Sequence, residues 1–364
     1  MIDFVIKKRI SAFRLDLSLR TEADVIGITG VSGSGKTTLL NCLAGLIRPD
    51  SGHIIVGDEC LFHSSKLDIP VHQRQVAVVF QDNRLFPHMS VEGNLNFALK
   101  HSKSEDKTFT IAEIAELVEI THLLKRSVRN LSGGELKRVA IGRAILSHPK
   151  LLLMDEPFAG MDGDLSWRIL GILEQIRYKL KIPMILVSHT LDEIQNLCDM
   201  LVIMREGQIK AAGKISDILA SKNAMQLLHA LDYSNRIDGR VKNVDRELGF
   251  VNVQVSPALT FRAPIADVKE GDSISYTLRT KDISISNAPI PNISIQNQLP
   301  CKITKVVIAE TGVICVLDCG VELLAEVTLG TAKKLKLEDG RIAWALFKTQ
   351  ALTPHLYRKL TLCK

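Results

Sequence analysis

The stretch that decides the fold is Ile28-Thr-Gly-Val-Ser-Gly-Ser-Gly-Lys-Thr-Thr38, which contains the pattern G-x-x-x-x-G-K-[ST]. The apolar run 25–28 before it predicts a buried strand, and leucines at 39, 40 and 43 predict a helix after it. This strand–loop–helix context favours a phosphate-binding loop over a glycine-rich turn with an incidental lysine. Lys36 would reach the β- and γ-phosphates, and the Thr37 hydroxyl would complete a Mg²⁺ shell. The candidate nucleotide-binding residues in this stretch are Gly30, Ser32, Gly33, Gly35, Lys36, Thr37 and Thr38.

A second helix start also has the composition of an anion-binding site. Residues 131–135 read Leu-Ser-Gly-Gly-Glu, and an amphipathic run follows them. Ser132 is a favoured N-cap residue, and Gly133 and Gly134 leave backbone N–H groups accessible. The segment therefore predicts a helix whose N-terminus binds phosphate.

Two apolar runs downstream end in residues that suit phosphoryl transfer. The run 151–154 is followed by Asp155 and Glu156, and the run 184–187 is followed by Ser188 and His189. Phosphoryl transfer needs a positioned metal and an aligned nucleophile. Asp155 suits a Mg²⁺ partner, Glu156 suits a residue that polarises water, and His189 would stand at the same strand edge.

These segments together resemble the ATP-binding subunits of ABC transporters. The resemblance implies an α/β P-loop NTPase with a RecA-like core and a helical subdomain. It assigns Gln81 to the Q-loop, 131–135 to the signature, and His189 to the switch histidine. It also assigns Asp162 to the D-loop, although Gly-Met-Asp replaces the commoner Ser-Leu-Asp. An aromatic residue that stacks on adenine is expected near the N-terminus, and Phe13 is either that residue or a core phenylalanine.

The resemblance implies catalytic, metal-binding and dimer roles for these residues. Glu156, His189 and Gln81 would be catalytic, and Thr37, Gln81 and Asp155 would hold Mg²⁺. In this family two subunits stack head to tail, so Ser132 and Gly134 would contact the γ-phosphate of ATP bound to the other subunit. ATP would then hold the homodimer closed until hydrolysis.

Composition limits the remaining possibilities. The chain has 364 residues, 46% of them hydrophobic, which is ordinary for a folded protein of two or three domains. No apolar run approaches the ~18 residues of a transmembrane helix, so we expect a separate integral-membrane permease. A formal net charge of +6 is a weak bias toward an anionic membrane surface and predicts no nucleic-acid partner. Seven scattered cysteines favour reduced thiols over disulfides or a metal site.

The chain divides into an α/β part and a β part. Strands alternate with helical patterns in 1–232, ending in an expected closing helix at 214–231. From 235 onward the chain alternates apolar and polar residues, and the segment 236–286 repeats weakly in 299–352. This predicts two repeats, at 235–288 and 290–364. We expect a tandem pair of OB-like barrels, the first TOBE-like and the second Mop-like. Two adjacent hairpin sets are the alternative.

Residues 81–95 and the tail resemble molybdate importer ATPases. The Q-loop region Gln81-Asp-Asn-Arg-Leu-Phe-Pro-His carries the first resemblance, and 294–300, 323–328 and 344–349 resemble a Mop-type oxyanion domain. The resemblance implies import of molybdate or tungstate on the cytoplasmic face of the inner membrane, supplied indirectly by a substrate-binding protein outside. Sulfate, sugar or polyamine import is the alternative. An ABC-type ATPase acting on DNA would need a long coiled coil or tandem nucleotide domains, and a purely regulatory protein would not need the hydrolytic residues.

Three tail residues are candidate oxyanion ligands. Ser294, Lys348 and Thr349 supply the hydroxyls and the cation that a tetrahedral oxyanion requires. The arginine that some Mop-type sites place after the serine is absent, and Gln296 stands near that position. The alternative is a solvated surface lysine and an ordinary strand threonine.

Overall fold

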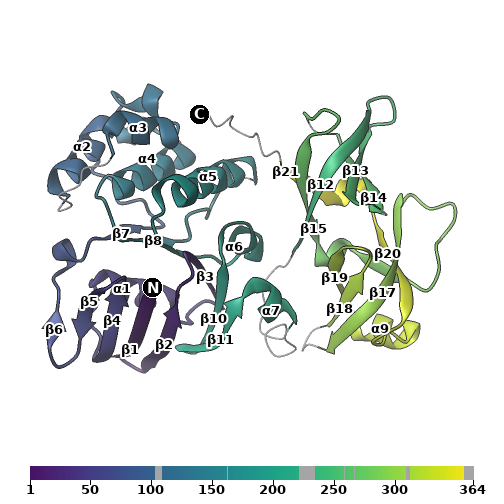
Figure 1. Cartoon of the computed structure of the whole chain (residues 1–364), viewed down its shortest axis with the longest axis horizontal. Helices are drawn as coiled ribbons and strands as arrows, with labels where there is room; N and C mark the ends of the chain where they lie inside the picture. The colour runs from purple at the N-terminus through teal and green to yellow at the C-terminus, as the bar shows by residue number, and fades with distance from the viewer. Residues whose placement is uncertain are drawn as a thin grey trace. The chain divides into compact units, whose positions relative to one another are not determined.

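The computed structural model describes residues 1–102, 109–161, 163–220, 234–257, 259–265, 267–308 and 312–355. It contains two compact units, 1–218 and 219–364, and Figure 1 shows the elements of each. No helix in the described part of the chain is both long enough and apolar enough to span a membrane.

An antiparallel sheet forms the N-terminal part of the first unit, in the order β2-β1-β4-β5-β6. Alternate residues of β1 and β2 are buried, as expected for strands with one face on a core. The strands are β1 (Ile2–Ile10), β2 (Phe13–Thr21), β4 (Ser51–Val56), β5 (Glu59–His63) and β6 (Leu67–Asp68).

A six-stranded sheet in the order β11-β10-β3-β9-β8-β7 forms the centre of this unit. All its strand pairs are parallel except β10 with β11. Ile28 of β3 and Asp155 of β8 both pair with Val187 of β9, so these three strands end at one edge. The residues that follow them therefore share the ligand-binding edge of a parallel sheet. The strands are β3 (Val25–Thr29), β7 (Val76–Val79), β8 (Leu151–Asp155), β9 (Met184–Val187), β10 (Met200–Arg205) and β11 (Gln208–Lys214).

Helices cover the central sheet and form a group of their own beyond β7 and β8. Figure 1 shows α2, α3 and α4 gathered there, at the opposite end of the unit from the antiparallel sheet. The buried face of α1 shares one hydrophobic core with both sheets. The α-helices are α1 (Lys36–Ala44), α2 (Val91–His101), α3 (Ile111–Leu117), α4 (Gly133–Ile145), α5 (Gly163–Gln175), α6 (Leu191–Leu197) and α7 (Ile215–Ala220). The single-turn helices are η1 (Val71–Gln73), η2 (Thr121–Leu123), η3 (Val128–Asn130) and the π-helix η4 (Ile176–Leu180).

The expected closing helix is described only at its start. Lys214 belongs to strand β11, and α7 covers 215–220. The rest of the predicted helix, 221–231, lies outside the described residues.

The second unit contains two antiparallel five-stranded sheets, in the orders β14-β13-β12-β15-β21 and β16-β20-β17-β18-β19. Their inner faces share one hydrophobic core, as in the predicted OB-like domain. Its elements are β12 (Ser234–Asp245), β13 (Phe250–Ser256), β14 (Leu259–Pro264), β15 (Ser273–Arg279), η5 (Thr280–Asp282), β16 (Ser284–Ser286), β17 (Asn297–Ile308), β18 (Val313–Asp318), β19 (Glu322–Val327), α9 (Leu329–Leu335), β20 (Ile342–Phe347), η6 (Thr349–Ala351) and β21 (Leu352–His355).

The two halves of the tail exchange their edge strands. Strand β16, from the segment 235–288, pairs with β20 of the other half. Strand β21, from the segment 290–364, pairs with β15 of the first half. Each sheet therefore takes one strand from the other segment. The division into the repeats 235–288 and 290–364 remains a prediction.

Two buried asparagines at equivalent positions join the halves. Asn297, at the start of β17, accepts the N–H of Arg262 at 2.8 Å and donates to its carbonyl at 2.8 Å. Asn235, near the start of β12, accepts the N–H of Leu324 at 2.6 Å and donates to the carbonyls of Leu324 at 2.9 Å and Leu278 at 3.2 Å. A side-chain amide can satisfy one backbone N–H and one C=O together, so each asparagine pairs with the backbone of an edge strand in the other half.

Candidate active site

The phosphate-binding loop runs from the end of β3 to the start of α1. Gly30 has φ of +151°, and a Cβ there would lie 2.1 Å from the carbonyl oxygen of Met204. Gly35 is the N-cap of α1 with φ of +100°, and no side chain caps the helix. A Cβ at Gly33 would meet nothing within 4 Å. The loop thus has the backbone that only glycine adopts easily, and its helix N-terminus is accessible to an anion.

A hollow of about 470 Å³ lies over this loop. Besides the loop, it is lined by Phe13 from the start of β2, Glu156 from the end of β8, and His189 from the end of β9. The strand register described above accounts for this convergence. The predicted residues that line the hollow are Phe13, Gly30, Ser32, Gly33, Gly35, Lys36, Thr37, Thr38, Glu156 and His189.

Lys36 places a cation inside the loop. Its Nζ donates to the carbonyls of Gly30 at 2.8 Å and Val31 at 3.2 Å. Burial lowers the pKa of Lys36, while the charges of Glu156 and Asp155 oppose that shift. The ammonium group is thus held at the loop that would surround the β- and γ-phosphates.

Asp155 and Thr37 form an oxygen-donor pair beside the loop. Burial raises the pKa of the Asp155 carboxyl, and its hydrogen bond with the Thr37 side chain opposes the shift. The described residues contain no group of three or more His, Cys, Asp or Glu side chains arranged to hold a metal. One carboxylate and one hydroxyl fit Mg²⁺, which binds through few protein ligands and takes the rest from phosphates and water.

Glu156 and His189 face each other across the hollow. The Nδ1 atom of His189 lies 3.7 Å from Oε1 of Glu156. Glu156 has a φ of +46°, and its N–H donates to the carbonyl of Val187 at 3.0 Å. A non-glycine residue in the left-handed region is a feature that clusters at active sites. The side chain of His189 is 62% exposed, so it is accessible to a ligand.

Phe13 touches both the hollow and the protein core. A Cβ at Gly35 would lie 2.9 Å from Phe13 Cζ, so the ring packs directly on the loop. The same ring is a partly buried neighbour of the core shared by the two sheets. The two interpretations of Phe13 are therefore compatible, since one face packs while the rest borders the hollow.

The signature residues and Gln81 do not line this hollow. Ser132 caps α4 in a capping box with Glu135, whose Oε2 accepts the Ser132 N–H at 2.7 Å. A Cβ at Gly134 would lie 2.5 Å from Leu165 of α5, whereas Gly133 is open. The α4 N-terminus is thus formed but separate from the loop of its own chain. Asp162 lies outside the described residues.

Lys137 is a residue of this region that sequence reasoning missed. It is 2% exposed, and its Nζ donates to the carbonyls of Phe80 at 3.1 Å and Gln81 at 3.3 Å. Burial lowers its pKa to about 8. It ties the signature helix to the backbone of the Q-loop. The signal was a lysine on the apolar face of an amphipathic helix, with Ala140 and Ile141 one turn further along.

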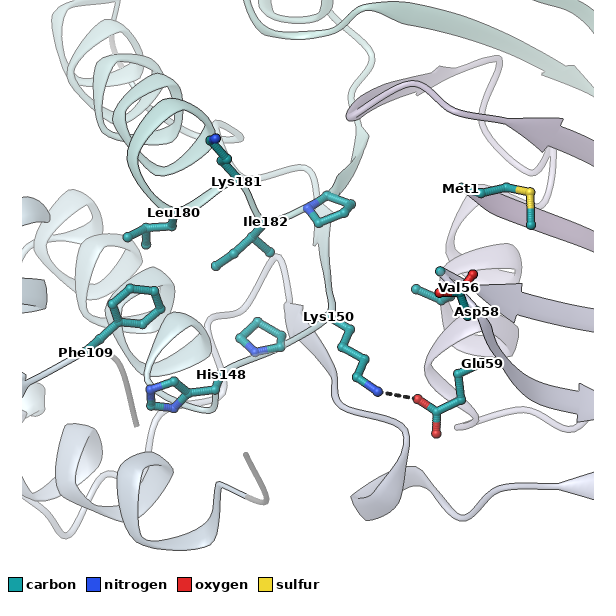
Figure 2. Close-up of a pocket in the computed structure, with 13 residues that line it drawn as sticks. Met1, Val56, Asp58, Glu59, Phe109, His148, Lys150, Leu180, Lys181 and Ile182 are labelled. Atoms are coloured by element: carbon teal, nitrogen blue, oxygen red, sulfur yellow. Dashed lines mark hydrogen bonds and ion pairs between the residues drawn. The ribbon is translucent and has the colours of Figure 1, made fainter. Parts of the chain in front are cut away.

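A larger hollow of about 710 Å³ lies at the other ends of the central strands. It is lined by the residues before β8 and β9, and Figure 2 shows Lys150 reaching across to Glu59. The Nζ–Oε2 distance of this ion pair is 2.6 Å. None of the predicted site residues lines it, and ligands of parallel sheets bind at the carboxyl ends of the strands.

The three candidate oxyanion ligands of the tail differ in their environments. Ser294 and Lys348 are exposed, whereas Thr349 is 3% exposed. The Thr349 hydroxyl donates to Oε1 of Gln296 at 2.8 Å. Gln296, which stands near the position where some Mop-type sites have an arginine, thus accepts the hydrogen bond that the Thr349 hydroxyl donates.

Comparisons with known proteins agree with this geometry. Residues 14–159 match the ABC transporter family, and residues 293–354 match the TOBE domain. A nucleotide-free ATP-binding cassette from an ABC transporter is 28% identical with a TM-score of 0.52, covering 62% of this chain and 98% of that one. The ADP conformation of the cassette MJ1267 is also 28% identical, with a TM-score of 0.51 over 63% and 98%. The first unit is therefore the ATP-hydrolysing cassette of an ABC transporter.

The full-length relatives narrow the class to one family. The molybdenum import ATP-binding protein ModC of Pseudomonas fluorescens is 36% identical over 346 residues, 93% of this chain and 96% of its own. ModC of Paramagnetospirillum magneticum is 34% identical over 351 residues, 96% of each chain. The chain belongs to the ModC family of molybdenum import ATP-binding proteins.

Proposed function

We propose that this chain is the ATP-hydrolysing subunit of an importer of molybdate or tungstate. The observation that carries the proposal is the convergence of the loop, Glu156 and His189 on one hollow, in a chain that aligns with ModC proteins over nearly its whole length. The test is oxyanion uptake by cells with and without the gene. Loss of molybdate or tungstate uptake in cells without the gene supports the proposal. Loss of sulfate, sugar or polyamine uptake instead would refute the assignment of molybdate or tungstate as the cargo.

The site residues have distinct roles in the proposed reaction. The loop N–H groups and Lys36 bind the β- and γ-phosphates, and Glu156 orients and polarises the attacking water. His189 borders the γ-phosphate region, and Gln81, which lies outside the hollow of this structure, would reach that region when nucleotide is bound. Thr37, Asp155 and Gln81 would hold Mg²⁺, which supplies charge neutralisation on the phosphate oxygens.

The signature completes the site in a homodimer. Ser132, Gly133 and Gly134 do not reach the loop of their own chain, although their helix N-terminus suits an anion. We propose that they contact ATP bound to a second copy, with Asp162 also at that interface. ATP then favours the closed dimer and hydrolysis favours the open one. The test is ATP-dependent dimerisation of the Glu156→Gln variant, measured by light scattering, with Ser132→Arg expected to abolish it.

The loop after the Q-loop is the proposed permease-docking surface. The segment Arg84–Asn94 carries Leu85, Phe86, Pro87 and Met89. The buried side chain of Asn94 holds it, because Oδ1 accepts the Phe86 N–H at 2.9 Å and Nδ2 donates to its carbonyl at 3.2 Å. Pro87 and the neighbouring His88 are exposed. These two bonds fix the backbone at Phe86, and apolar patches on a protein surface mark interaction sites.

Crosslinking tests the docking surface directly. A cysteine at His88 is expected to crosslink to a cytoplasmic helix of the permease in a nucleotide-dependent manner. A cysteine at exposed Tyr178, on η4, is the control. Absence of any crosslink from His88 under all nucleotide conditions would contradict the assignment. Docking of this kind would place the chain peripherally at the cytoplasmic face of the inner membrane.

The tail is proposed to be a regulatory module that senses the cargo oxyanion. Lys348 and Ser294 are exposed donors near the Thr349–Gln296 pair in sequence. A chain that ends near residue 232 is expected to hydrolyse ATP but to lose inhibition by molybdate. Calorimetric titration of the full chain tests the site, with Lys348→Ala expected to weaken binding. Absence of any response to millimolar oxyanion would leave the tail as a dimerisation element.

A further inference from the structure

The hydrogen bonds beneath His189 differ from those of the capping boxes that begin α3 and α4 in the same unit. Both α3 and α4 begin with a capping box, in which the N3 glutamate accepts the N–H of the N-cap residue directly. Helix α6 has Thr190 at its N-cap and Glu193 at N3, so the same box is possible in sequence. Instead, the Thr190 N–H donates to the Ser188 hydroxyl at 2.9 Å, and that hydroxyl contacts Oε2 of Glu193. A serine side chain is thus inserted into the box.

Ser188 is fixed on its other side by the phosphate-binding strand. It is 1% exposed, and its N–H donates to the carbonyl of Ile28 at 3.1 Å, next to the loop. His189 lies between this serine and the N-cap Thr190. Both neighbours of His189 are therefore held through the one hydroxyl that Glu193 contacts.

We propose that Glu193 is a positioning residue for His189, acting through the Ser188 hydroxyl on the backbone that carries the imidazole. The inference rests on the proposed role of His189 in hydrolysis. Glu193 lines neither the hollow nor the loop, so its effect belongs to the turnover step and not to nucleotide binding.

The contact has two hydrogen-bond patterns that differ by one proton. A hydroxyl has one proton to donate, and Ser188 Oγ lies near both Glu193 and the Thr190 carbonyl, the latter at 3.2 Å. When Glu193 is ionised, it takes the serine proton in a charge-assisted bond. When Glu193 is neutral, its own proton goes to Ser188, and the serine proton goes to the Thr190 carbonyl. The ionised state holds Ser188 more firmly.

The surroundings of Glu193 bring this exchange near neutral pH. Burial raises the pKa of Glu193 to about 7, against the hydrogen bond from Ser188, which lowers it. The charges of Asp192 on the same helix and Glu156 at the end of β8 add to the upward shift. Helix α6 packs against β3, which has no charged residue, and against α5. On α5, Arg168 pairs with Glu119. Glu174 is the other charged side chain described on α5, and Arg177 of η4 donates to the Leu197 carbonyl of α6 and pairs with Asp199. The charges that shift the pKa of Glu193 are those of the two acids, Asp192 and Glu156.

The test compares the pH dependence of ATP hydrolysis between matched variants of the full chain. Glu193→Gln mimics the neutral acid, so its kcat should equal that of the wild type near pH 6 and fall about fivefold below it near pH 8, the size of one net hydrogen bond. KM for ATP should not change. Ser188→Ala removes the hydroxyl that both protonation states use, so its kcat should fall below that of the wild type at both pH values and by more near pH 8. Adding Glu193→Gln to it should have no further effect. Glu113→Gln, at N3 of the exposed capping box of α3, is the control and should keep the wild-type profile.

The outcomes separate this inference from the proposed function. A ratio of kcat between Glu193→Gln and wild type that stays constant from pH 6 to pH 8 would overturn the role of Glu193. Additive effects of Ser188→Ala and Glu193→Gln would overturn the relay. If Glu193→Gln does not fold, the Ser188→Ala profile decides the matter. A wild-type chain that hydrolyses no ATP at any pH would refute the proposed function instead.

Discussion

The asparagine at the start of β17 gives a stability prediction that can be worked from its contacts. Asn297 is 3% exposed, and its two hydrogen bonds to Arg262, both 2.8 Å, satisfy one N–H and one C=O on an edge strand. Asn297→Ala removes the side chain that makes both hydrogen bonds, so the N–H and the C=O of Arg262 lose their partner. An unsatisfied backbone group in a partly buried place costs about 1–3 kcal/mol. Because solvent reaches this edge in part, we expect a loss of about 2–4 kcal/mol in the free energy of unfolding of the tail.

The assay needs a reporter that lies in the tail alone. The chain has two tryptophans, Trp167 on α5 and Trp344 on β20, so a Trp167→Phe background makes fluorescence report the second unit during urea unfolding. The matched control is Asn252→Ala. The Nδ2 of Asn252 donates to Oδ1 of the exposed Asn243 side chain at 2.7 Å, so this substitution should cost under about 0.5 kcal/mol. Hydrogen exchange of β14 should also quicken in Asn297→Ala. Equal costs for Asn297→Ala and Asn252→Ala would refute the reasoning.

Three further predictions concern the cassette. Glu156→Gln should bind ATP but lose about 10²-fold or more in turnover, whereas Lys36→Ala should fail at nucleotide binding. Binding of a fluorescent nucleotide and release of phosphate distinguish the two defects. Near-normal hydrolysis by Glu156→Gln would contradict the assignment of Glu156. Lys137→Met should leave the carbonyls of Phe80 and Gln81 without their donor and lower kcat about tenfold. Lys137→Gln keeps an N–H donor and should retain more of the wild-type kcat. Equal kcat values for the two variants would argue against the role of this contact. The effect of Glu193→Gln on the free energy of unfolding should depend on pH. An acid whose pKa is raised on folding from 4.5 to about 7 destabilises the fold as pH rises through that window, by up to about 3 kcal/mol above it. The variant should therefore be more stable than wild type near pH 8 and equal to it near pH 4.5 in urea titrations, and a pH-independent difference would contradict the assignment.

Local sequence was sufficient for the parts of the site that lie on one short segment. The loop 30–38 sets its own conformation, because glycine spacing and the following helix start act over a few residues. Ser132 likewise caps its helix through Glu135, three residues away. The apolar runs before Asp155 and His189 are buried strands, as their composition predicts.

Sequence could not supply contacts that depend on which strands become neighbours. The exchange of β16 and β21 between the sheets requires pairings such as Ile285 with Ala345 and Leu278 with Leu352, which lie far apart in the sequence. Short strands carry no register signal of that range. Lys137 was visible as a helical residue, yet its partners are backbone carbonyls of residues 80 and 81, which any sequence provides.

The amino-acid sequence by itself determined the class of chemistry, since phosphate-binding glycines, Lys36, Asp155, Glu156 and His189 act through residue type and local spacing. Only the tertiary structure decided how these groups meet and what supports them. The parallel register of β3, β8 and β9 brings three separate strand ends to one hollow. The same packing places the Ser188 hydroxyl between the N-cap N–H of α6 and the Glu193 carboxylate, where a local capping box was equally possible. Burial and neighbouring charge, which depend on the whole fold, then set the proton affinity of that carboxylate.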